Sequence, residues 1–252
     1  MTVPAYKMNS SPRMAELDGR FIFHLEMKHG WPECTLECDD YKVRRAATVL
    51  EYMSTASLVT QMYSRKGYLT DGIAAAPRRE NTITLDAHDA QQVMGTLTVR
   101  LDAREGGLLA DALYKNEIDA FRTDGRKVCE VSKLAVDPRY GSKDLMASLF
   151  QLAYLYAHRI YRATDAFIEV NPRHAGFYKR MLGFREIGEL RICPRVNAPA
   201  VLLHVELEYM RAQIALHGGR GTATSERSLY PYFLRCNAED WIDRAMRAKK
   251  AH

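Results

Sequence analysis

Apolar and polar residues alternate along several short stretches of the chain, and this period of two predicts β-strands. The clearest stretch is 128–136, which is followed by a turn containing Gly141. Because side chains alternate across a strand, Glu130 and Ser132 are expected to share one face and Lys133 to lie on the other. The two predicted faces consist of Glu130, Ser132, Leu134 and Val136, and of Val131, Lys133 and Ala135. A carboxylate and a hydroxyl that point the same way mark either a site or a strand end that reaches solvent.

Other segments carry apolar residues at spacings of three and four, which is typical of amphipathic helices. The first begins at Thr48, whose side chain can cap it together with Glu51, and it ends at Gly67. Pro172 and Gly183 bracket another helix, near its first turn and just past its end. The expected helices cover residues 48–66, 108–121, 141–163 and 173–182, with apolar faces at Val49, Met53, Ala56, Val59 and Tyr63 in the first and at Leu145, Leu149, Leu152 and Tyr156 in the third.

Strands that alternate with helices, with hairpins at both ends, predict an α/β fold in which helices cover a mixed sheet. The expected strands cover residues 21–27, 41–46, 82–85, 93–101, 128–136, 166–170, 184–191 and 201–208. We divide the chain into an N-terminal extension (1–40), a main domain (41–209) and a C-terminal part (210–252) with a linker, an aromatic segment and a basic helix. The aromatic segment, 229–233, must bury itself on this domain or on a neighbouring subunit, which leaves a homo-oligomer open.

The composition limits what the protein does. A net charge of +5 over 252 residues favours an acidic partner and gives no indication of nucleic-acid binding. No apolar run approaches the roughly 18 residues of a membrane span, and residues 1–20 lack the apolar centre of a signal peptide. Five cysteines, an odd number, are expected to be reduced thiols in the cytoplasm. Cys34 and Cys38 lack two convincing further ligands, so no metal site is expected.

Two motifs resemble the GNAT superfamily of N-acetyltransferases, as does the order of the predicted elements. Residues 171–184, from Asn171 through Phe177-Tyr178 to Gly183-Phe184, are similar to its Asn…Phe-Tyr…Leu-Gly-Phe signature. Residues 136–141 resemble its Val-x-Pro-x-x-Arg-Gly loop, although the second glycine is absent. In the usual loop, backbone N–H groups at a helix N-terminus bind coenzyme A phosphates. The resemblance implies a GNAT-like, mostly antiparallel twisted sheet flanked by helices.

A narrower resemblance covers roughly residues 41–235. Glu130-Val131-Ser132-Lys133 is similar to the Glu-x-Ser-Arg motif of acyl-homoserine-lactone synthases, with Lys133 in place of arginine. The segments 56–69, 191–200 and 228–233 resemble long-chain N-acyl amino acid synthases of FeeM type. This resemblance implies transfer of a long acyl chain from an acyl carrier protein thioester to the amino group of an amino acid.

The chemistry of thioester aminolysis, together with these resemblances, suggests roles for the candidate residues. Glu130 is the candidate base, directly or through water, or pairs with the substrate ammonium. Ser132 binds substrate or orients Glu130, and Tyr178 lies near the departing sulfur or is a core residue. Backbone N–H groups are candidates to polarise the thioester carbonyl, namely those of Leu134, Ala135 and Val136. The candidates to bind the pantetheine and phosphate are Arg139, Gly141, Ser142, Lys143 and Asn171. The candidates to bind a substrate carboxylate are Arg100, Lys133 and, alternatively, Arg139.

The expected co-substrate is acyl-phosphopantetheine on a carrier protein, or acyl-CoA, with no covalently bound cofactor. Between Arg139 and Arg185 there are eight basic and three acidic residues, which would steer an acidic carrier protein to the site or are ordinary exposed helix charges. A long acyl tail needs an apolar tunnel, which the faces of the helices at 48–66 and 141–163 are candidates to line. The alternatives are an acyl-CoA-dependent N-acetyltransferase, a homoserine-lactone synthase, and a non-catalytic GNAT-fold binding module.

Overall fold

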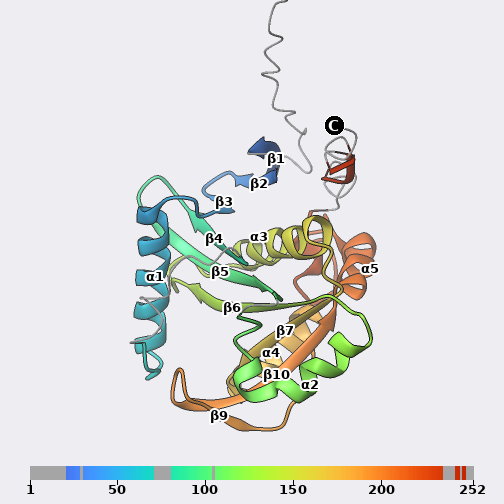
Figure 1. Cartoon of the computed structure of the whole chain (residues 1–252). Coiled ribbons are helices and arrows are strands. Elements are labelled where there is room, and N and C mark those ends of the chain that lie inside the picture. Colours follow the sequence, from blue (N-terminus) through green and yellow to red (C-terminus); the bar gives the residue numbers. More distant parts are fainter. Residues whose placement is uncertain are drawn as a thin grey trace, which may run out of the picture.

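The computed structural model describes residues 21–28, 31–70, 81–103, 106–234, 242–244 and 246–247. Within them, strands form one twisted sheet that carries helices on both faces (Figure 1). The strands are β1 (Phe21–Lys28), β2 (Trp31–Cys38), β3 (Lys42–Arg45), β4 (Thr82–His88), β5 (Val93–Leu101), β6 (Val128–Val136), β7 (Asp165–Val170), β8 (Arg185–Glu186), β9 (Arg191–Cys193) and β10 (Ala198–Glu206). The helices are α1 (Val49–Ser64), α2 (Asp111–Thr123), α3 (Lys143–Tyr154), which continues as a π-helix over Leu155–Ile160, α4 (Pro172–Leu182) and α5 (Leu207–His217).

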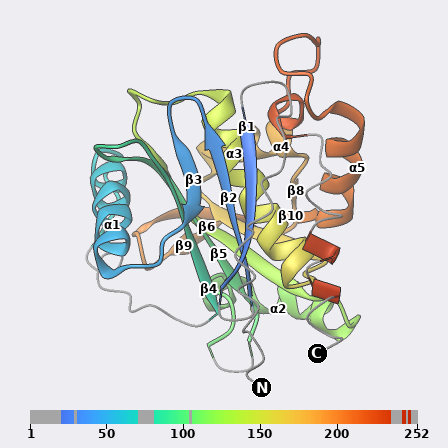
Figure 2. The ribbon, with the colours of Figure 1, turned by 90° about the horizontal axis from the view of Figure 1, so that it is seen from above.

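The strand order is β1-β2-β3-β4-β5-β6-β7-β10-β8, and β9 pairs with β10. Every pairing is antiparallel except β6 with β7. This confirms the predicted mixed, mostly antiparallel sheet. The described part of the 1–40 extension forms β1 and β2, which add two strands at one edge of that sheet (Figure 2). Residues 71–79, whose Gly, Ala and Pro content predicts a loop, lie outside the described residues.

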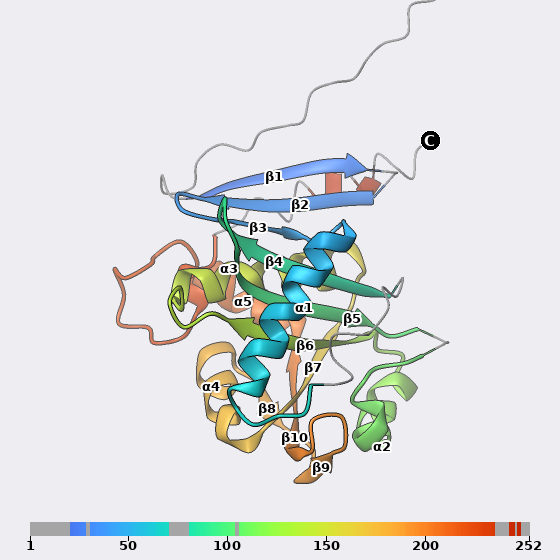
Figure 3. The same ribbon diagram turned by 90° about the vertical axis from the view of Figure 1, so that its left-hand side faces the viewer.

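The helices divide between the two faces of the sheet, so that α1 and α2 cover one face and α3, α4 and α5 the other. Phe167 of β7 and Leu202 of β10 pack with α2 residues, whereas their strand neighbours face the cluster that contains α3. In Figure 3, α1 crosses the sheet in front of β4, β5 and β6. Alternate residues of β7 and β10 therefore face apolar partners on the two sides of the sheet, which buries this part of it.

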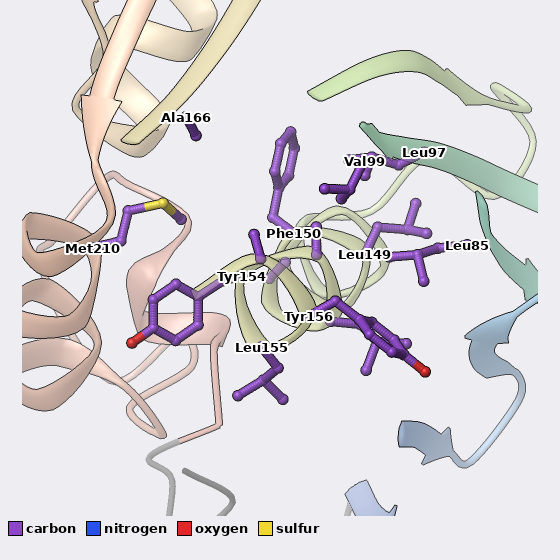
Figure 4. Packing of buried hydrophobic residues seen from close by; sticks show 14 of the residues in the cluster. Leu85, Leu97, Val99, Leu149, Phe150, Tyr154, Leu155, Tyr156, Ala166 and Met210 are labelled. Atoms are coloured by element: carbon purple, nitrogen blue, oxygen red, sulfur yellow. The ribbon is translucent and has the colours of Figure 1, made fainter. Parts of the chain in front are cut away.

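The main hydrophobic core surrounds α3, as the spacing of three and four predicts. Leu145, Leu149 and Tyr156 are each 1% exposed or less. Figure 4 shows Leu149 beside Leu85 of β4, and Tyr154 on the side of α3 that faces α5. The apolar face of α3 therefore forms the core of the protein.

The predicted strand 184–191 is mostly irregular. Only β8 pairs with β10 before the chain turns away to β9. At Gly188 a Cβ atom would lie 2.7 Å from Leu202 and 2.8 Å from the Tyr114 ring, so the backbone passes closely over β10 there. Ile187 N–H donates to the Leu202 carbonyl (3.0 Å), which replaces a regular ladder at this point.

Beyond β10 the chain forms a helix that was not predicted and an aromatic segment that is buried. The residues from Leu207 onwards form α5, so the predicted strand 201–208 ends two residues early and the helix was not foreseen. The aromatic segment docks on this domain: Tyr230 and Phe233 are 2% and 1% exposed, and the Tyr230 hydroxyl donates to the Leu182 carbonyl at 2.6 Å. Of the predicted helix 240–250, most residues lie outside the described ranges.

Candidate active site

Helix α1 and the sheet beneath it enclose a cavity of about 1020 Å³. Its walls combine the apolar face of α1, threonines of β4 and β5, all of β6 after Cys129, the end of β7, α4 and the turn between β9 and β10. The volume lies at the upper end of the roughly 300–1,000 Å³ that small-molecule sites occupy. The predicted apolar face of α1 lines this cavity: Val49, Met53, Ala56, Val59 and Tyr63.

The apolar spacing of α1 therefore marks residues that line a cavity. Thr48 caps the helix and Glu51 completes the capping box, as predicted. Val49 and Met53, however, are 75% and 62% exposed because they face the open cavity rather than the core. Helix α3 contributes only Met146 to the cavity among the described residues, so of these two helices it is α1 that lines the cavity.

Strands β6 and β7 separate at the cavity. Their parallel pairing runs from Val128 opposite Asp165 to Glu130 opposite Phe167 and then ends. Residues 131–136 of β6 and residues 168–170 of β7 line the cavity on its two sides. The sheet therefore opens at its centre. Leu134, Ala135 and Val136, whose backbone N–H groups are predicted to polarise a thioester carbonyl, line the cavity.

A β-bulge in β6 makes the predicted alternation wrong beyond Ser132. Thr98 of β5 lies opposite Ser132, and Thr96 lies opposite Ala135, so β6 contains one residue more than its partner. Lys133 has φ +52°, the left-handed region that non-glycine residues rarely occupy. Ala135 consequently shares the face of Glu130 and packs with α1, whereas the prediction assigned it to the opposite face.

Glu130 lines the cavity and is 1% exposed. Its Oε2 accepts hydrogen bonds from the N–H groups of Leu109 (2.5 Å) and Ala110 (3.2 Å), at the N-terminus of α2. Ala110 itself provides no side-chain cap, so the carboxylate takes that role. Burial raises the pKa of Glu130 to about 7, although the two N–H groups oppose this by favouring the charged form. A carboxyl group with this pKa can accept a proton near neutral pH.

Charged side chains surround Glu130. Arg100 of β5 lies opposite it in the strand ladder and is 5% exposed. Burial and the charge of Arg100 lower the pKa of Lys133, which also lines the cavity. Arg195, from the turn after β9, pairs with Glu169 of β7 at 2.7 Å. Neither Arg195 nor Glu169 was predicted to be a site residue, although Arg195 falls inside the segment 191–200 that resembles the FeeM-type synthases.

The other two predicted catalytic residues also reach the cavity. The Ser132 Oγ is buried and has no hydrogen-bond partner among the residues that the structure describes, which leaves it available to a ligand. Tyr178 of α4 packs edge-on against Phe150 and Phe184, with ring centroids at 6.4 and 6.0 Å. Burial raises the pKa of Tyr178 above its usual value, so the hydroxyl stays protonated. His174 lines the same wall.

Of the five residues predicted to bind pantetheine and phosphate, only Asn171 lines the cavity, and its side chain also caps α4. Arg139 pairs with Asp137 at 2.6 Å, and this guanidinium lowers the pKa of Asp137 to about 2. The Ser142 hydroxyl accepts the Leu145 N–H and caps α3, and the Lys143 ammonium lies 5.3 Å over the Tyr232 ring. Gly141 precedes this helix but does not contact the cavity.

Within the described ranges, no helix has the length and the apolar character of a membrane-spanning segment. No group of three or more His, Cys, Asp or Glu side chains in the same ranges is placed to hold a metal ion.

The sheet opens beside a buried carboxylate and a large cavity, and the family match makes this chain an N-acyltransferase. The family model for the N-acyl amino acid synthase FeeM matches residues 54–206, and the chain belongs to that family. FeeM, an N-acyl amino acid synthase from uncultured soil microbes, is 28% identical to it over 68% of this chain and 94% of that one, with a TM-score of 0.63.

Two further solved structures are less similar to the chain. A GNAT-family acetyltransferase from Streptococcus pneumoniae is 15% identical over 66% of this chain and 99% of that one, with a TM-score of 0.48. Arabidopsis thaliana NAA60 in complex with acetyl-CoA is 14% identical over 67% and 99%, with a TM-score of 0.47. No curated protein sequence matches the chain.

Proposed function

We propose that this N-acyltransferase transfers a long-chain acyl group from an acyl carrier protein thioester to the amino group of an amino acid. The observation that carries the proposal is the position of Glu130, a buried carboxyl group with a pKa of about 7 in the wall of a cavity of about 1020 Å³. Such a cavity takes an apolar chain and the acceptor together, while the carboxyl group accepts a proton from the acceptor's amine.

In this mechanism the amine nitrogen attacks the thioester carbonyl carbon and gives a proton to Glu130, directly or through water. The C–N bond forms and the C–S bond breaks, while backbone N–H groups of residues 134–136 stabilise the oxyanion. The Tyr178 hydroxyl, which its raised pKa keeps protonated, donates a hydrogen bond to the departing thiolate, and the proton that Glu130 took from the amine passes to that sulfur to give the free thiol. Pairing of Glu130 with the acceptor ammonium before proton transfer is compatible with the same placement.

The acceptor carboxylate binds between Arg100 and Lys133. These two cations lie close enough that the charge of one lowers the pKa of the other, so a bound carboxylate relieves their repulsion. Ser132, with its Oγ available, adds a hydrogen bond at the same place. The apolar face of α1 holds the acyl tail, since burial contributes about 0.8 kcal/mol for each methylene.

A carrier protein fits the donor site better than coenzyme A. The residues that resemble the pyrophosphate loop are already engaged, Arg139 with Asp137 and Ser142 as a helix cap. Near the cavity, α4 presents Arg173, Lys179 and Arg180 to solvent, and Arg173 stacks 5.1 Å over the Tyr68 ring. Carrier proteins are acidic, so this helix is the proposed docking surface. Described cysteines are free thiols, consistent with a reaction in the cytoplasm.

Reversing all three α4 cations to glutamate is expected to reduce kcat/KM for carrier-bound donors by at least tenfold, because like charges repel the carrier. The same acyl group on coenzyme A should lose less than threefold. Initial rates with the two donors measure the difference. An equal loss with both donors would show that α4 does not dock the carrier.

The function itself is tested by mass spectrometry of lipid extracts from a bacterial host that expresses the chain, compared with the Glu130→Gln variant. New N-acyl amino acids that vanish in the variant are expected, and they identify both substrates. Acyl-homoserine lactones in the extract, or short N-acetyl products made only from acetyl-CoA, would overturn the proposal in favour of the alternative enzymes. No product with any donor, from folded protein, would favour a binding module.

A further inference from the structure

Arg195 connects to Glu130 through a single residue. Its Nη1 donates to the Leu109 carbonyl at 2.8 Å, and the Leu109 N–H donates to Glu130 Oε2 at 2.5 Å. The Arg195 Nη2 donates to Glu169 Oε2 at 2.7 Å, and the Glu169 side chain is only 6% exposed. The guanidinium therefore bridges two partners: the turn that holds the base, and a buried carboxylate on the neighbouring strand.

We propose that Arg195 is a positioning residue that holds Glu130 through Leu109 and, together with Glu169, sets the pH at which Glu130 accepts a proton. This inference rests on the proposed function of Glu130 as the base and adds two residues to its machinery. Neither residue need touch the acceptor for this role, because both act through the 109–110 turn and through their charges.

The charges of the pair act on Glu130 in opposite directions. Burial is the largest influence on its pKa, the positive charge of Arg195 lowers the pKa, and the negative charge of Glu169 raises it. Arg100 on β5 and Lys133 on β6 also line the cavity, as does Cys193 of β9, a neighbour of Glu169 whose thiol pKa burial raises. The Tyr114 hydroxyl on α2 stays neutral, because burial raises its pKa to about 12. Removing Arg195 should therefore raise the pKa of Glu130, and removing Glu169 should lower it.

A neighbouring arginine provides a matched control. Arg191, four residues earlier, also donates to a carbonyl at the α2 region, that of Leu113, and pairs with a carboxylate, Glu117, at 2.5 Å. It lies 4.6 Å over the Tyr114 ring. Arg191 does not line the cavity, so it shares the bonding pattern of Arg195 without the connection to Glu130.

The experiment measures kcat/KM against pH, from about 5.5 to 9, for Arg195→Gln, Glu169→Gln, the double variant, Arg195→Lys and Arg191→Gln. The acidic limb of this profile is the part in which kcat/KM rises as Glu130 loses its proton. Its midpoint should move up by about 1 pH unit in Arg195→Gln and down by a similar amount in Glu169→Gln. It should return near the wild-type position in the double variant, because both charges are gone. Arg195→Lys keeps the charge and loses the two-pronged geometry, so kcat should fall about tenfold with the limb unmoved. Arg191→Gln should leave the limb unchanged.

Thermal unfolding identifies any variant that fails to fold. If Arg195→Gln does not fold, Arg195→Lys and Glu169→Gln are used in its place. Limbs that stay at the wild-type pH in both charge-removing single variants, while Glu130→Gln is inactive, would overturn this inference and leave the proposed function in place. Equal limb shifts in Arg191→Gln and Arg195→Gln would also overturn it. A Glu130→Gln variant with the wild-type rate and profile would instead overturn the role of Glu130 itself.

Discussion

Replacing Glu130 by glutamine separates catalysis from folding at this site. The amide is nearly the same size as the carboxyl group, and its Oε1 can still accept the N–H groups of Leu109 and Ala110. What the variant loses is the ability to accept a proton. A positioned general base contributes roughly 10²- to 10⁴-fold, so kcat/KM is expected to fall by that factor. Each tenfold loss corresponds to about 1.4 kcal/mol of transition-state stabilisation.

The same substitution has the opposite effect on stability. Burial raises the pKa of Glu130 from 4.5 to about 7, so the folded state binds this proton more tightly than the unfolded state. The stability that the group contributes is complete below about pH 4.5 and is lost as the pH rises to about 7. A pKa difference of about 2.5 corresponds to about 3 kcal/mol. Glutamine cannot ionise, so above pH 7 the variant should be more stable than wild type by up to about 3 kcal/mol.

The assay combines initial rates of thiol release from an acyl thioester, between pH 5.5 and 9, with urea unfolding at pH 5 and pH 8. The wild-type rate should rise through about pH 7, and the variant should lack that rise. The stability gain of the variant should shrink at pH 5. A folded variant with the wild-type rate would remove Glu130 from the mechanism. A variant destabilised by 2 kcal/mol or more at pH 8 would show that the carboxylate is mainly structural.

The remaining predictions concern the cavity wall and the end of α4. Ala56→Trp fills part of the cavity beside α1, so it should lower kcat/KM at least tenfold for long-chain donors and little for short ones. The exposed Ser57→Trp variant should not change kcat/KM for either donor. Equal rates across chain lengths in Ala56→Trp would show that the tail binds elsewhere. Gly183→Ala should cost roughly 2 kcal/mol in urea unfolding, because φ is +78° and the new Cβ would lie 2.3 Å from the Tyr209 ring. Gly176→Ala, in open space on the same helix, should not destabilise, and a similar loss in both variants would refute this reasoning.

Local features of the chain were readable in advance because their causes lie within a few residues. The capping box at Thr48 and Glu51 needs only neighbouring side chains, and it is present as predicted. Strand β6 runs over the predicted 128–136, since its alternation and closing turn are both local. The apolar spacing of α3 likewise identified residues that the core buries. Glu130, Ser132 and Tyr178 were selected through motifs, and the structure brings all three to one cavity.

Other features depend on partners that are distant in sequence. Residues 207–217 lacked a strong helical pattern, and α5 is stabilised by packing of Met210 and Ile214 on the far face of the sheet. The bulge at Lys133 depends on the register between β5 and β6, which the alternation of β6 alone does not contain. Val49 and Met53 looked like core positions because a cavity wall and a core have the same apolar spacing.

The sequence by itself determined the mixed sheet, most of its elements and the carboxylate at its centre. Only the tertiary structure decided what surrounds that carboxylate. The Arg195 side chain binds Leu109, whose N–H group donates to Glu130, and Glu169 enters from β7, so the two charges that act on the pKa of Glu130 come from two separate segments. This pKa depends on burial and on distances between these groups, and such quantities exist only once the chain has folded.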